Sequence, residues 1–533
     1  MNITTLTNQV SVSEQIHTDD IQTLASQGVQ IIVCNRPDGE AADQPSFAEI
    51  SAAAATQGIK AVNLPFTAGQ MNEDQALEFA GLLASGERIH AYCRTGNRST
   101  QIFNAAAGDA APVAAAPQQT PKKAAATYDV VIIGAGSGGI AACSSLLKRD
   151  QTLRIALIDP SSKHYYQPGW TMVGGGIFDA KSTERETTQL VDRRASLLNN
   201  RVTQVVADVN KVVLDDGSEV HYKQLIVAPG LVINWAAIEG LEETLGKNGV
   251  TSNYRYDLAP YTWELVQQTE KGTAIFTQPP MPIKCAGAPQ KALYLSADYW
   301  LKNKRLNNIN IDFCNAGGVL FGVPAYVDAL MSYIKKYRAD LSFNHNLVKV
   351  DGATRKAWFD VTDADGNKTQ VCKAFDMLHV CPPQSAPDFI RTSGLSDQAG
   401  WLDVNPQTLR HNHYSNIWGL GDVMNTTNAK TMAAVRKQVP VVAANICAVQ
   451  AGKDPQAAYD GYGSCPLTVE RGKIVLAEFC YGGRVAPTFP SWLNNGVKPT
   501  RLAWLLKSVG LPFVYWNMML KGREWFTDCP AEK

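Results

Sequence analysis

One cysteine lies among residues that suit thiolate chemistry. Cys285 sits in the stretch PIKCAGAPQK, between Lys284 and Lys291, and a helix is expected to start near Pro289. Two ammonium groups and the positive end of a helix each favour a thiolate over a thiol. A thiolate is a strong nucleophile that can also hold sulfane sulfur, so Cys285 is the first candidate catalytic residue.

A second cysteine, Cys93, follows an expected strand over residues 88–92 and precedes a glycine-bearing loop. Such a loop surrounds the sulfur with backbone N–H groups that stabilise a thiolate. Arg94 and Arg98 add positive charge and offer paired donors to an oxyanion. The alternative is a cysteine that only fills the apolar core, but the two flanking arginines favour a reactive thiol.

The framework that must position these cysteines is indicated by residues 128–147, YDVVIIGAGSGGIAACSSLL. An apolar strand, a tight glycine turn and a helix follow one another, as in dinucleotide-binding folds. Gly134 allows the bend, Gly136 lets the backbone approach a pyrophosphate, and Gly139 lets the helix pack closely. The next apolar strand ends at Asp159, whose carboxylate suits the hydroxyls of an adenosine ribose.

Two later stretches also place turn-forming or acidic residues at the ends of apolar strands. The first, YKQLIVAPG, closes in a tight turn, and the second, NIWGLGD, ends in a carboxylate. The residues concerned are Ala228, Pro229, Gly230, Gly421 and Asp422. A helix is expected to begin at Lys430 and Thr431, a few residues after Asp422, and its positive end can stabilise an anionic ring of a bound cofactor.

Length and composition bound the protein class. A chain of 533 residues is expected to form about three or four domains, and its zero formal net charge argues against nucleic-acid binding. The N-terminus lacks the pattern of a secretory signal, and no apolar run is long enough to span a bilayer. The eleven cysteines are scattered without CxxC spacing, which argues against a zinc site and favours a reducing, cytosolic compartment.

The order of these features predicts an α/β protein in several parts. An Ala- and Pro-rich stretch is typical of an extended tether that would let one active site visit another. The expected parts are a small α/β domain at 1–106, a tether at 107–126, a dinucleotide-binding domain at 127–260 and 390–489, a second dinucleotide-fold domain with redox cysteines at 261–389, and an amphipathic segment at 490–533.

The small domain resembles rhodanese-like sulfurtransferases and cysteine-dependent phosphatases, on the loop CRTGNRS together with IIVCNRPDGE and AVNLPF. The phosphatase pattern has five residues between the cysteine and the arginine. Arg98 follows Cys93 after four, so the spacing fits a sulfurtransferase better. The domain looks like the small phosphatase-like domain fused to sulfide-metabolising enzymes, and the resemblance implies that Cys93 carries a persulfide.

Residues 127–533 resemble the sulfide:quinone oxidoreductases, notably the mitochondrial-like group. The resemblance rests on the three strand-end motifs in order, on PIKCAGAPQK, and on HYYQPGWTMVGGG, MLHVCPP and FVYWNMML. It implies tandem Rossmann-like domains that bind FAD, with Asp422 at the ribityl and pyrophosphate portion. It also implies that sulfide is oxidised, that electrons pass to a quinone, and that Cys285 is the cysteine beside the flavin.

In that family a second cysteine directly follows the Gly-Asp pair of the third motif, and here that position is Val423. Cys381, at an expected strand end in MLHVCPP, is the favoured replacement. Alternatively Cys93, delivered by the tether, attacks sulfur held on Cys285. Cys314 is a weaker candidate because its position in a strand indicates core. The remaining cysteines are interpreted as structural; they include Cys143, Cys372, Cys447 and Cys465.

Two other functions stay open. An FAD-dependent persulfide or disulfide reductase would use NAD(P)H, but residues 309–322 lack a second GxGxxG and Cys143 has no partner on its helix. A membrane-attached sulfide sensor or persulfide carrier without turnover is the other alternative, and Val423 is its main support. Under the main interpretation the partners are sulfide, a quinone and a small thiol such as glutathione, and a homo-oligomer is compatible with the sequence.

The last segment carries many aromatic and apolar residues interspersed with lysine and arginine. Short amphipathic helices of this composition lie in a membrane interface without crossing it, whereas the alternative is a buried pair of core helices. Because quinones are membrane solutes, we expect a peripheral membrane protein, on the cytoplasmic side. Phe321, Tyr515 and Trp516 are the expected quinone contacts.

Overall fold

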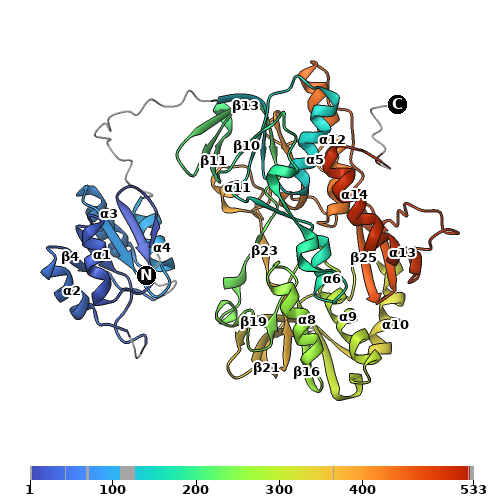
Figure 1. The fold of residues 1–533 in the computed structure, drawn as a ribbon, viewed down its shortest axis with the longest axis horizontal. Coiled ribbons are helices and arrows are strands. Elements are labelled where there is room, and N and C mark those ends of the chain that lie inside the picture. The colour runs from blue at the N-terminus through green and yellow to red at the C-terminus, as the bar shows by residue number, and fades with distance from the viewer. Residues whose placement is uncertain are drawn as a thin grey trace. The chain divides into compact units, whose positions relative to one another are not determined.

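The computed structural model describes residues 3–41, 44–67, 71–107, 126–363, 365–525 and 527. The chain divides into two compact units, Met1–Lys122 and Lys123–Lys533 (Figure 1). The tether expected at 107–126 lies outside the described residues except for its first and last residue.

The small unit is a five-stranded sheet in the order β1-β2-β5-β3-β4, flanked by helices. All neighbours except β1 and β2 are parallel. The central strands β3 and β5 are buried along their whole length, as expected of parallel strands covered on both faces. The elements are β1 Ile3–Thr5, β2 Val10–Ser13, α1 Ile21–Ser26, β3 Ile31–Cys34, α2 Phe47–Thr56, β4 Lys60–Asn63, α3 Glu73–Ala84, β5 Ile89–Tyr92 and α4 Asn97–Ala107.

The two largest sheets of the large unit have seven and five strands, and the seven-stranded sheet comes first in the chain. Its strands are β10 Ser196–Leu198, β7 Ile155–Ile158, β6 Ala126–Ile133, β13 Glu219–Val227, β12 Lys211–Leu214 and β11 Val202–Val206, in that order, with β24 Ile417–Gly419 paired to β13. Strands β6, β13 and β24 are parallel neighbours, so their carboxyl ends reach the same edge. The three strand-end motifs of the sequence therefore meet there. Helices α5 Ser137–Arg149 and α12 Met432–Gln450 pack together beside this sheet.

The second sheet is parallel and has five strands. They are β15 Val250–Thr251, β22 Met377–His379, β16 Gly272–Gln278, β17 Ile309–Asn315 and β18 Ala339–Phe343, in that order. The main helices beside it are α8 Leu258–Gln268, α9 Ala288–Lys302 and α10 Val327–Tyr337, and a three-stranded sheet is formed by β19 His345–Asp351, β20 Lys356–Thr362 and β21 Lys368–Ala374. Because β15 belongs to this sheet, the sheet takes in residues that precede position 261.

A hairpin late in the chain, β25 Gly463–Glu470 and β26 Lys473–Phe479, belongs to the core of this second region. Its apolar side chains, among them Cys465 and Leu467, pack in one cluster with Leu293 and Ala297 of α9. The sequence analysis assigns these positions to the first dinucleotide-binding domain. The structure packs them against α9, which changes the neighbours of Cys465.

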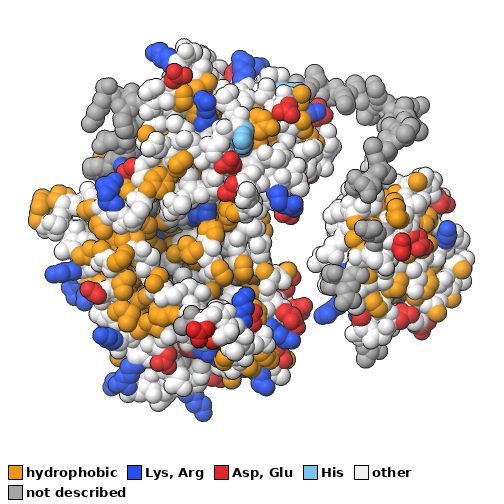
Figure 2. All heavy atoms as spheres, turned by 180° about the vertical axis from the view of Figure 1, so that it is seen from behind, with side chains coloured by type: hydrophobic (Ala, Val, Ile, Leu, Met, Phe, Trp, Pro, Cys, Tyr) orange, Lys and Arg blue, Asp and Glu red, His pale blue; other side chains and the backbone are white. Residues whose placement is uncertain are grey.

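The C-terminal segment forms a broken helix that runs over the surface of the large unit. It consists of α13 Arg501–Leu505, a π-helical turn Leu506–Gly510 and α14 Leu511–Asn517. Hydrophobic side chains gather on the side of the unit that carries these helices (Figure 2). The exposed apolar residues of this segment are Trp492, Leu493, Leu502, Leu505, Val509, Phe513 and Trp525.

Within the described ranges, only α12 is long and apolar enough to cross a membrane. It is the helix that packs on α5, and 56% of its apolar window is buried inside the protein. The apolar composition of α12 is therefore explained by its position in the protein core.

Candidate active site

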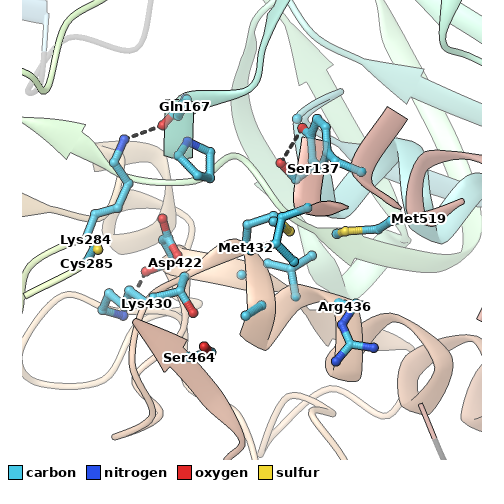
Figure 3. Close-up of a pocket in the computed structure, with 18 of the residues that line it drawn as sticks. Ser137, Gln167, Lys284, Cys285, Asp422, Lys430, Met432, Arg436, Ser464 and Met519 are labelled. Atoms are coloured by element: carbon cyan, nitrogen blue, oxygen red, sulfur yellow. Dashed lines mark hydrogen bonds between the residues drawn. The ribbon is translucent and has the colours of Figure 1, made fainter. Parts of the chain in front are cut away.

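The carboxyl ends of β6, β13 and β24 border a cavity of about 710 Å³. Its walls include Gly136, Asp159, Gly230, Asp422 and Cys285, so every strand-end motif and the candidate nucleophile contribute to one site. Figure 3 shows Lys284, Cys285, Asp422 and Lys430 close together, with Ser137 and Met519 across the cavity from them.

The glycine turn after β6 has the geometry that close backbone approach requires. Gly134 has φ +98°, and a Cβ there would lie 2.4 Å from the carbonyl oxygen of Ala228. A Cβ on Gly139 would lie 1.8 Å from the carbonyl oxygen of Gly134. A Cβ on Gly136, in contrast, would meet no protein atom within 4 Å and would point into open space at the cavity wall. Gly136 is therefore dispensable for the fold and suited to a ligand.

The strand that follows supplies a carboxylate at the same edge. Asp159 accepts hydrogen bonds from the backbone N–H of Ala135 at 2.7 Å and of Ser161 at 2.8 Å. These bonds fix the carboxylate beside the glycine turn, at the cavity wall where the sequence analysis expects a ribose.

The third motif and the following helix close another side of the cavity. The Lys430 ammonium donates hydrogen bonds to the carbonyl oxygens of Asp422 at 2.8 Å and Met424 at 2.6 Å, and it lies 4.1 Å from the centre of the Trp401 ring. Burial lowers the pKa of Lys430 to about 8. Thr431 caps α12 by accepting a hydrogen bond from a backbone N–H, so the positive end of that helix lies at the cavity.

Cys285 lies on the loop before α9, and the backbone holds it in an unusual conformation. Its φ is +51°, a region that non-glycine residues rarely adopt. Its N–H donates to the carbonyl oxygen of Lys430 at 3.0 Å, which ties the loop to the third motif. Helix α9 begins at Ala288, close to the start expected near Pro289, and brings the Lys291 ammonium 3.1 Å from the Cys285 sulfur.

The sulfur of Cys465 lies 3.4 Å from the sulfur of Cys285. A hydrogen bond from the Cys465 thiol lowers the pKa of Cys285 well below its usual range, and the charges of Lys291 and Lys507 act in the same direction. The sequence analysis interprets Cys465 as structural. The structure instead places it in contact with the candidate nucleophile.

The second cysteine favoured from the sequence, Cys381, follows β22 and is fully buried. It shares an apolar cluster with Cys285 and Tyr254 but does not line the cavity. Burial raises the pKa of Cys381 to about 12, so its thiol is a poor nucleophile. Val423 is also buried, and Cys314 lies in the core of β17 as expected.

The sequence analysis did not single out Lys507, which reaches the cavity from the π-helical turn. Its ammonium donates a hydrogen bond to the carbonyl oxygen of Pro168 at 2.9 Å. Burial, reinforced by the charge of Lys291, lowers the pKa of Lys507 to about 7. A lysine that titrates near neutral pH can supply or accept a proton. The only sequence signal was a lysine in an apolar segment.

The three expected quinone contacts lie in different surroundings. Tyr515 lines the cavity and is buried, and its hydroxyl bonds His164 Nε2 at 2.6 Å and Ser137 Oγ at 2.8 Å. It therefore lies beside the glycine turn. Trp516 packs on the Tyr515 ring but is absent from the cavity wall, and Phe321 is a core residue of the second region rather than a cavity residue.

In the small unit, the loop after β5 wraps around the sulfur of Cys93. The Gly96 N–H donates to this sulfur at 3.1 Å, and Cys93 is buried. Arg94 is exposed, whereas Arg98 is buried and pairs with both carboxylate oxygens of Glu40 at 2.7 Å. The guanidinium expected to bind an oxyanion is thus largely occupied by Glu40, which the sequence analysis did not anticipate.

Two families match different parts of the chain. Residues 2–111 match the family described as Beta-lactamase hydrolase-like protein, phosphatase-like domain. Residues 128–262 match the family described as Pyridine nucleotide-disulphide oxidoreductase. The first match agrees with the predicted phosphatase-like domain, and the second covers the glycine turn and the strand of the second motif.

Three curated relatives cover most of the remaining chain. The mitochondrial sulfide:quinone oxidoreductase of Mus musculus is 38% identical over 395 residues, which are 74% of this chain and 87% of that protein. The enzyme of Dictyostelium discoideum is 40% identical, covering 74% and 86% respectively. The enzyme of Schizosaccharomyces pombe is 34% identical, covering 75% and 91%.

A solved structure gives the same fold. The sulfide:quinone oxidoreductase of Aquifex aeolicus superposes with a TM-score of 0.62 at 19% identity, over 75% of this chain and 92% of that chain.

The cavity also fits the FAD of this fold. Within the described residues, Trp170, Thr171 and Asn253 line the cavity and each has a buried polar atom without a partner in the protein, which is typical of a site built for a polar ligand. Gly136 leaves open space for such a ligand beside the glycine turn. The volume lies in the range of ordinary ligand sites. The protein is a flavoenzyme oxidoreductase that binds FAD. The chain belongs to the sulfide:quinone oxidoreductase family.

Proposed function

We propose that the protein oxidises sulfide to sulfane sulfur and transfers the electrons to a quinone. The observation that carries this proposal is the position of Cys285, which faces the cavity with its sulfur held beside Lys291. A thiolate in this position is both a nucleophile and a sulfur carrier. Family membership supports sulfide and quinone as the substrates.

Different residues around the cavity are proposed to bind different parts of the cofactor. Bound FAD supplies the two-electron acceptor. Gly134, Gly136 and Asp159 are proposed to hold its adenosine and pyrophosphate part, because they form the cradle after β6. The N-terminus of α12 is proposed to stabilise negative charge on the flavin ring, because this helix end, capped by Thr431, lies at the cavity.

The test is to add sulfide to the purified protein without oxygen, follow the flavin absorbance, and then add a short-chain ubiquinone. We expect bleaching by sulfide and recovery on addition of the quinone. Unchanged absorbance with sulfide would contradict the proposal. Bleaching by NAD(P)H instead would favour a persulfide or disulfide reductase, although β17 leads into Asn315-Ala316-Gly317-Gly318 rather than a second GxGxxG.

The small unit is proposed to pass the sulfane sulfur to a small thiol through Cys93. Its sulfur receives a hydrogen bond from the Gly96 N–H at 3.1 Å, which holds in place the residue that would accept the sulfur. Carrying this thiol on the same chain raises its effective concentration to about millimolar when the tether has a suitable length. The final acceptor is proposed to be a small thiol such as glutathione.

Replacement of Cys93 by serine is expected to slow persulfide formation on glutathione several-fold at low glutathione concentration. Reduction of the flavin by sulfide is expected to stay unchanged, because Cys285 and its surroundings are intact. The matched control is Cys34→Ser, which changes a buried cysteine of the neighbouring strand β3. The relay is wrong if Cys93→Ser forms the same product at the wild-type rate.

The C-terminal helices are proposed to lie in a membrane interface, from which quinone reaches the cavity. Leu505, Val509 and Phe513 are each between half and two-thirds exposed, which is unusual for apolar side chains that lie close together. Phe513 also lines the cavity, so the cavity extends to this apolar surface. Peripheral attachment would place the opening where quinone is dissolved.

The double variant Leu505→Asp/Val509→Asp is expected to lose binding to phospholipid vesicles in a sedimentation assay, because it puts two charges on the apolar face. Neither residue lines the cavity, so reduction of a soluble short-chain quinone should be retained. The control is Leu77→Asp, which changes an equally exposed leucine of the small unit. Undiminished vesicle binding by the double variant would show that another surface attaches the protein.

A further inference from the structure

We propose that Glu40 determines the specificity of the Cys93 site, because its carboxylate occupies the place of a substrate oxyanion. The proposal rests on the proposed role of Cys93 as a sulfur acceptor. It names the class of sulfur donor that this cysteine takes, which is a persulfide whose reacting end carries no oxyanion. It also names the class that is excluded, which comprises thiosulfate and phosphate esters.

The topology of the small sheet brings this carboxylate to the loop that carries the cysteine. Glu40 follows β3 and Arg98 follows β5, and these two strands are parallel neighbours. The N–H of Asn35, just after β3, donates to the Tyr92 carbonyl oxygen at 2.8 Å. The pairing of the strands thus continues up to the residue before Cys93, and the segments that follow both strands start at the same edge.

The carboxylate engages both terminal nitrogens of Arg98. Nη1 donates to Oε1 of Glu40 and Nη2 donates to Oε2, each at 2.7 Å. Two parallel hydrogen bonds of this kind are how an arginine binds a carboxylate, sulfate or phosphate group. Nη1 also donates to the carbonyl oxygen of Phe66 at 2.7 Å. The donors that an external oxyanion would need are therefore already in use.

A second guanidinium holds the same carboxylate. Arg36 Nε donates to Glu40 Oε2 at 3.0 Å, and Arg36 Nη1 donates to Gln15 Oε1 at 2.9 Å. Arg36 and Arg98 are only 5% and 7% exposed, so both charges require an anionic partner. Hydrogen bonds from Arg98 and then Arg36 hold the pKa of Glu40 below its usual range, although burial opposes them. Glu40 is therefore a carboxylate at neutral pH.

Arg98 also lies beside the sulfur that would react. The Glu40 carboxylate raises the pKa of the Arg98 guanidinium, and the nearby Cys93 sulfur acts in the same direction. An oxyanion that reached Cys93 would have to share this guanidinium, and the Glu40 carboxylate would repel it. A persulfide transfers its outer sulfur without any oxyanion that needs Arg98. It can react while the Arg98–Glu40 pair stays intact.

Contacts on the other side of its loop hold Glu40 in this position. Gly39 has φ +82°, which suits the turn just before Glu40. Asp38 accepts a hydrogen bond at 2.8 Å from the N–H of Phe47, the first residue of α2. Gln44 donates to the carbonyl oxygen of Pro37 at 2.9 Å. Free anions in solution therefore compete with a carboxylate that is permanently attached beside the two guanidinium groups.

The reaction that Glu40 prevents is the transfer of sulfur from thiosulfate to cyanide. The Cys93 thiolate would form a bond to the outer sulfur of thiosulfate, the sulfur–sulfur bond of thiosulfate would break, and sulfite would leave with the electron pair. Cyanide would then take the outer sulfur from Cys93 as thiocyanate and restore the thiolate. In the first step Arg98 and Arg36 would bind the oxygens of the leaving sulfite.

The experiment compares full-length wild type with Glu40→Ala and Glu40→Gln. Binding of inorganic sulfate is measured by titration calorimetry, and thiocyanate formation is measured with thiosulfate and cyanide. We expect Glu40→Ala to bind sulfate and to form thiocyanate at least about tenfold better than wild type, because charge-assisted donors become free. Glu40→Gln keeps the shape and loses the charge, so it should show a smaller gain in both measurements.

The matched control is Glu87→Gln, which changes a carboxylate just before β5, at the opposite end of this strand from Cys93. It should behave as wild type. The double variant Cys93→Ser/Glu40→Ala should keep the gain in sulfate binding and lose the gain in thiocyanate formation. If Glu40→Ala unfolds at a lower temperature than wild type, sulfate should raise that temperature again, because the anion replaces the missing charge.

The proposal is overturned if Glu40→Ala binds sulfate and uses thiosulfate no better than wild type, or if the double variant forms thiocyanate as fast as Glu40→Ala. Neither measurement involves sulfide, flavin or quinone, so both are independent of the proposed oxidation. If Cys93→Ser leaves the relay to glutathione unchanged while Glu40→Ala gains sulfate binding, the relay is wrong and the exclusion of oxyanions by Glu40 stands.

Discussion

Replacement of Cys285 by serine is expected to abolish the reduction of the flavin by sulfide, with a loss of roughly a thousandfold or more, as for other catalytic nucleophiles. A serine hydroxyl is far less acidic than a thiol and cannot carry sulfane sulfur, so Lys291 has no thiolate to stabilise. The measurement is the rate of bleaching by sulfide in a stopped-flow spectrometer without oxygen.

The Cys285→Ser variant should remain folded and keep its FAD, because the exchange hardly changes the side-chain volume. Dithionite should still bleach its flavin, which separates loss of sulfide chemistry from loss of cofactor. The control is Cys143→Ser, which alters a buried cysteine on α5 outside the cavity wall. If sulfide bleached the flavin of Cys285→Ser at the wild-type rate, Cys285 would not be the nucleophile of the proposed function.

Replacement of Gly139 by alanine is expected to destabilise the protein by about 3 kcal/mol or more, which is the upper end of the usual cost of overpacking a core. The new Cβ would lie 1.8 Å from the carbonyl oxygen of Gly134, and the start of α5 would have to move off the glycine turn. The measurement is thermal unfolding together with the FAD content of the purified variant.

Gly136→Ala is the informative comparison, because its Cβ would meet no protein atom within 4 Å. This variant should unfold at the wild-type temperature when FAD is removed from both proteins, yet bind FAD at least about tenfold more weakly, a loss of about 1.4 kcal/mol. Equal FAD affinity in Gly136→Ala and wild type would show that the pyrophosphate does not lie against this residue.

The parts of the fold that depend on local sequence could be predicted. The glycine spacing after residue 133 predicts strand, turn and helix, because contacts within a few residues or to the neighbouring strand leave no room for a side chain at Gly134 and Gly139. The three strand-end motifs predict an FAD cavity for the same reason, since parallel neighbouring strands end at one edge. The strand expected over residues 88–92 of the small unit also agrees with β5 to within one residue.

The contacts that decide the chemistry could not be predicted, because they join distant positions. Cys465 approaches Cys285 only because the β25–β26 hairpin packs on α9. Arg98 is neutralised by Glu40, which lies 58 positions away. Lys507 is buried within a π-helical turn, and no residue pattern in this segment predicts such a turn. Composition and spacing describe neighbours along the chain and do not describe these pairs.

The late position of the β25–β26 hairpin also has a consequence for how the protein is made. A ribosome adds about 5–20 residues per second, so the 180 positions between Cys285 and Cys465 take on the order of ten seconds or more to synthesise. Until the hairpin has emerged and packed on α9, Cys285 lacks its neighbouring sulfur. The nascent chain therefore carries the Cys285 thiol without this neighbour, and the contact between the two sulfurs forms only late in maturation.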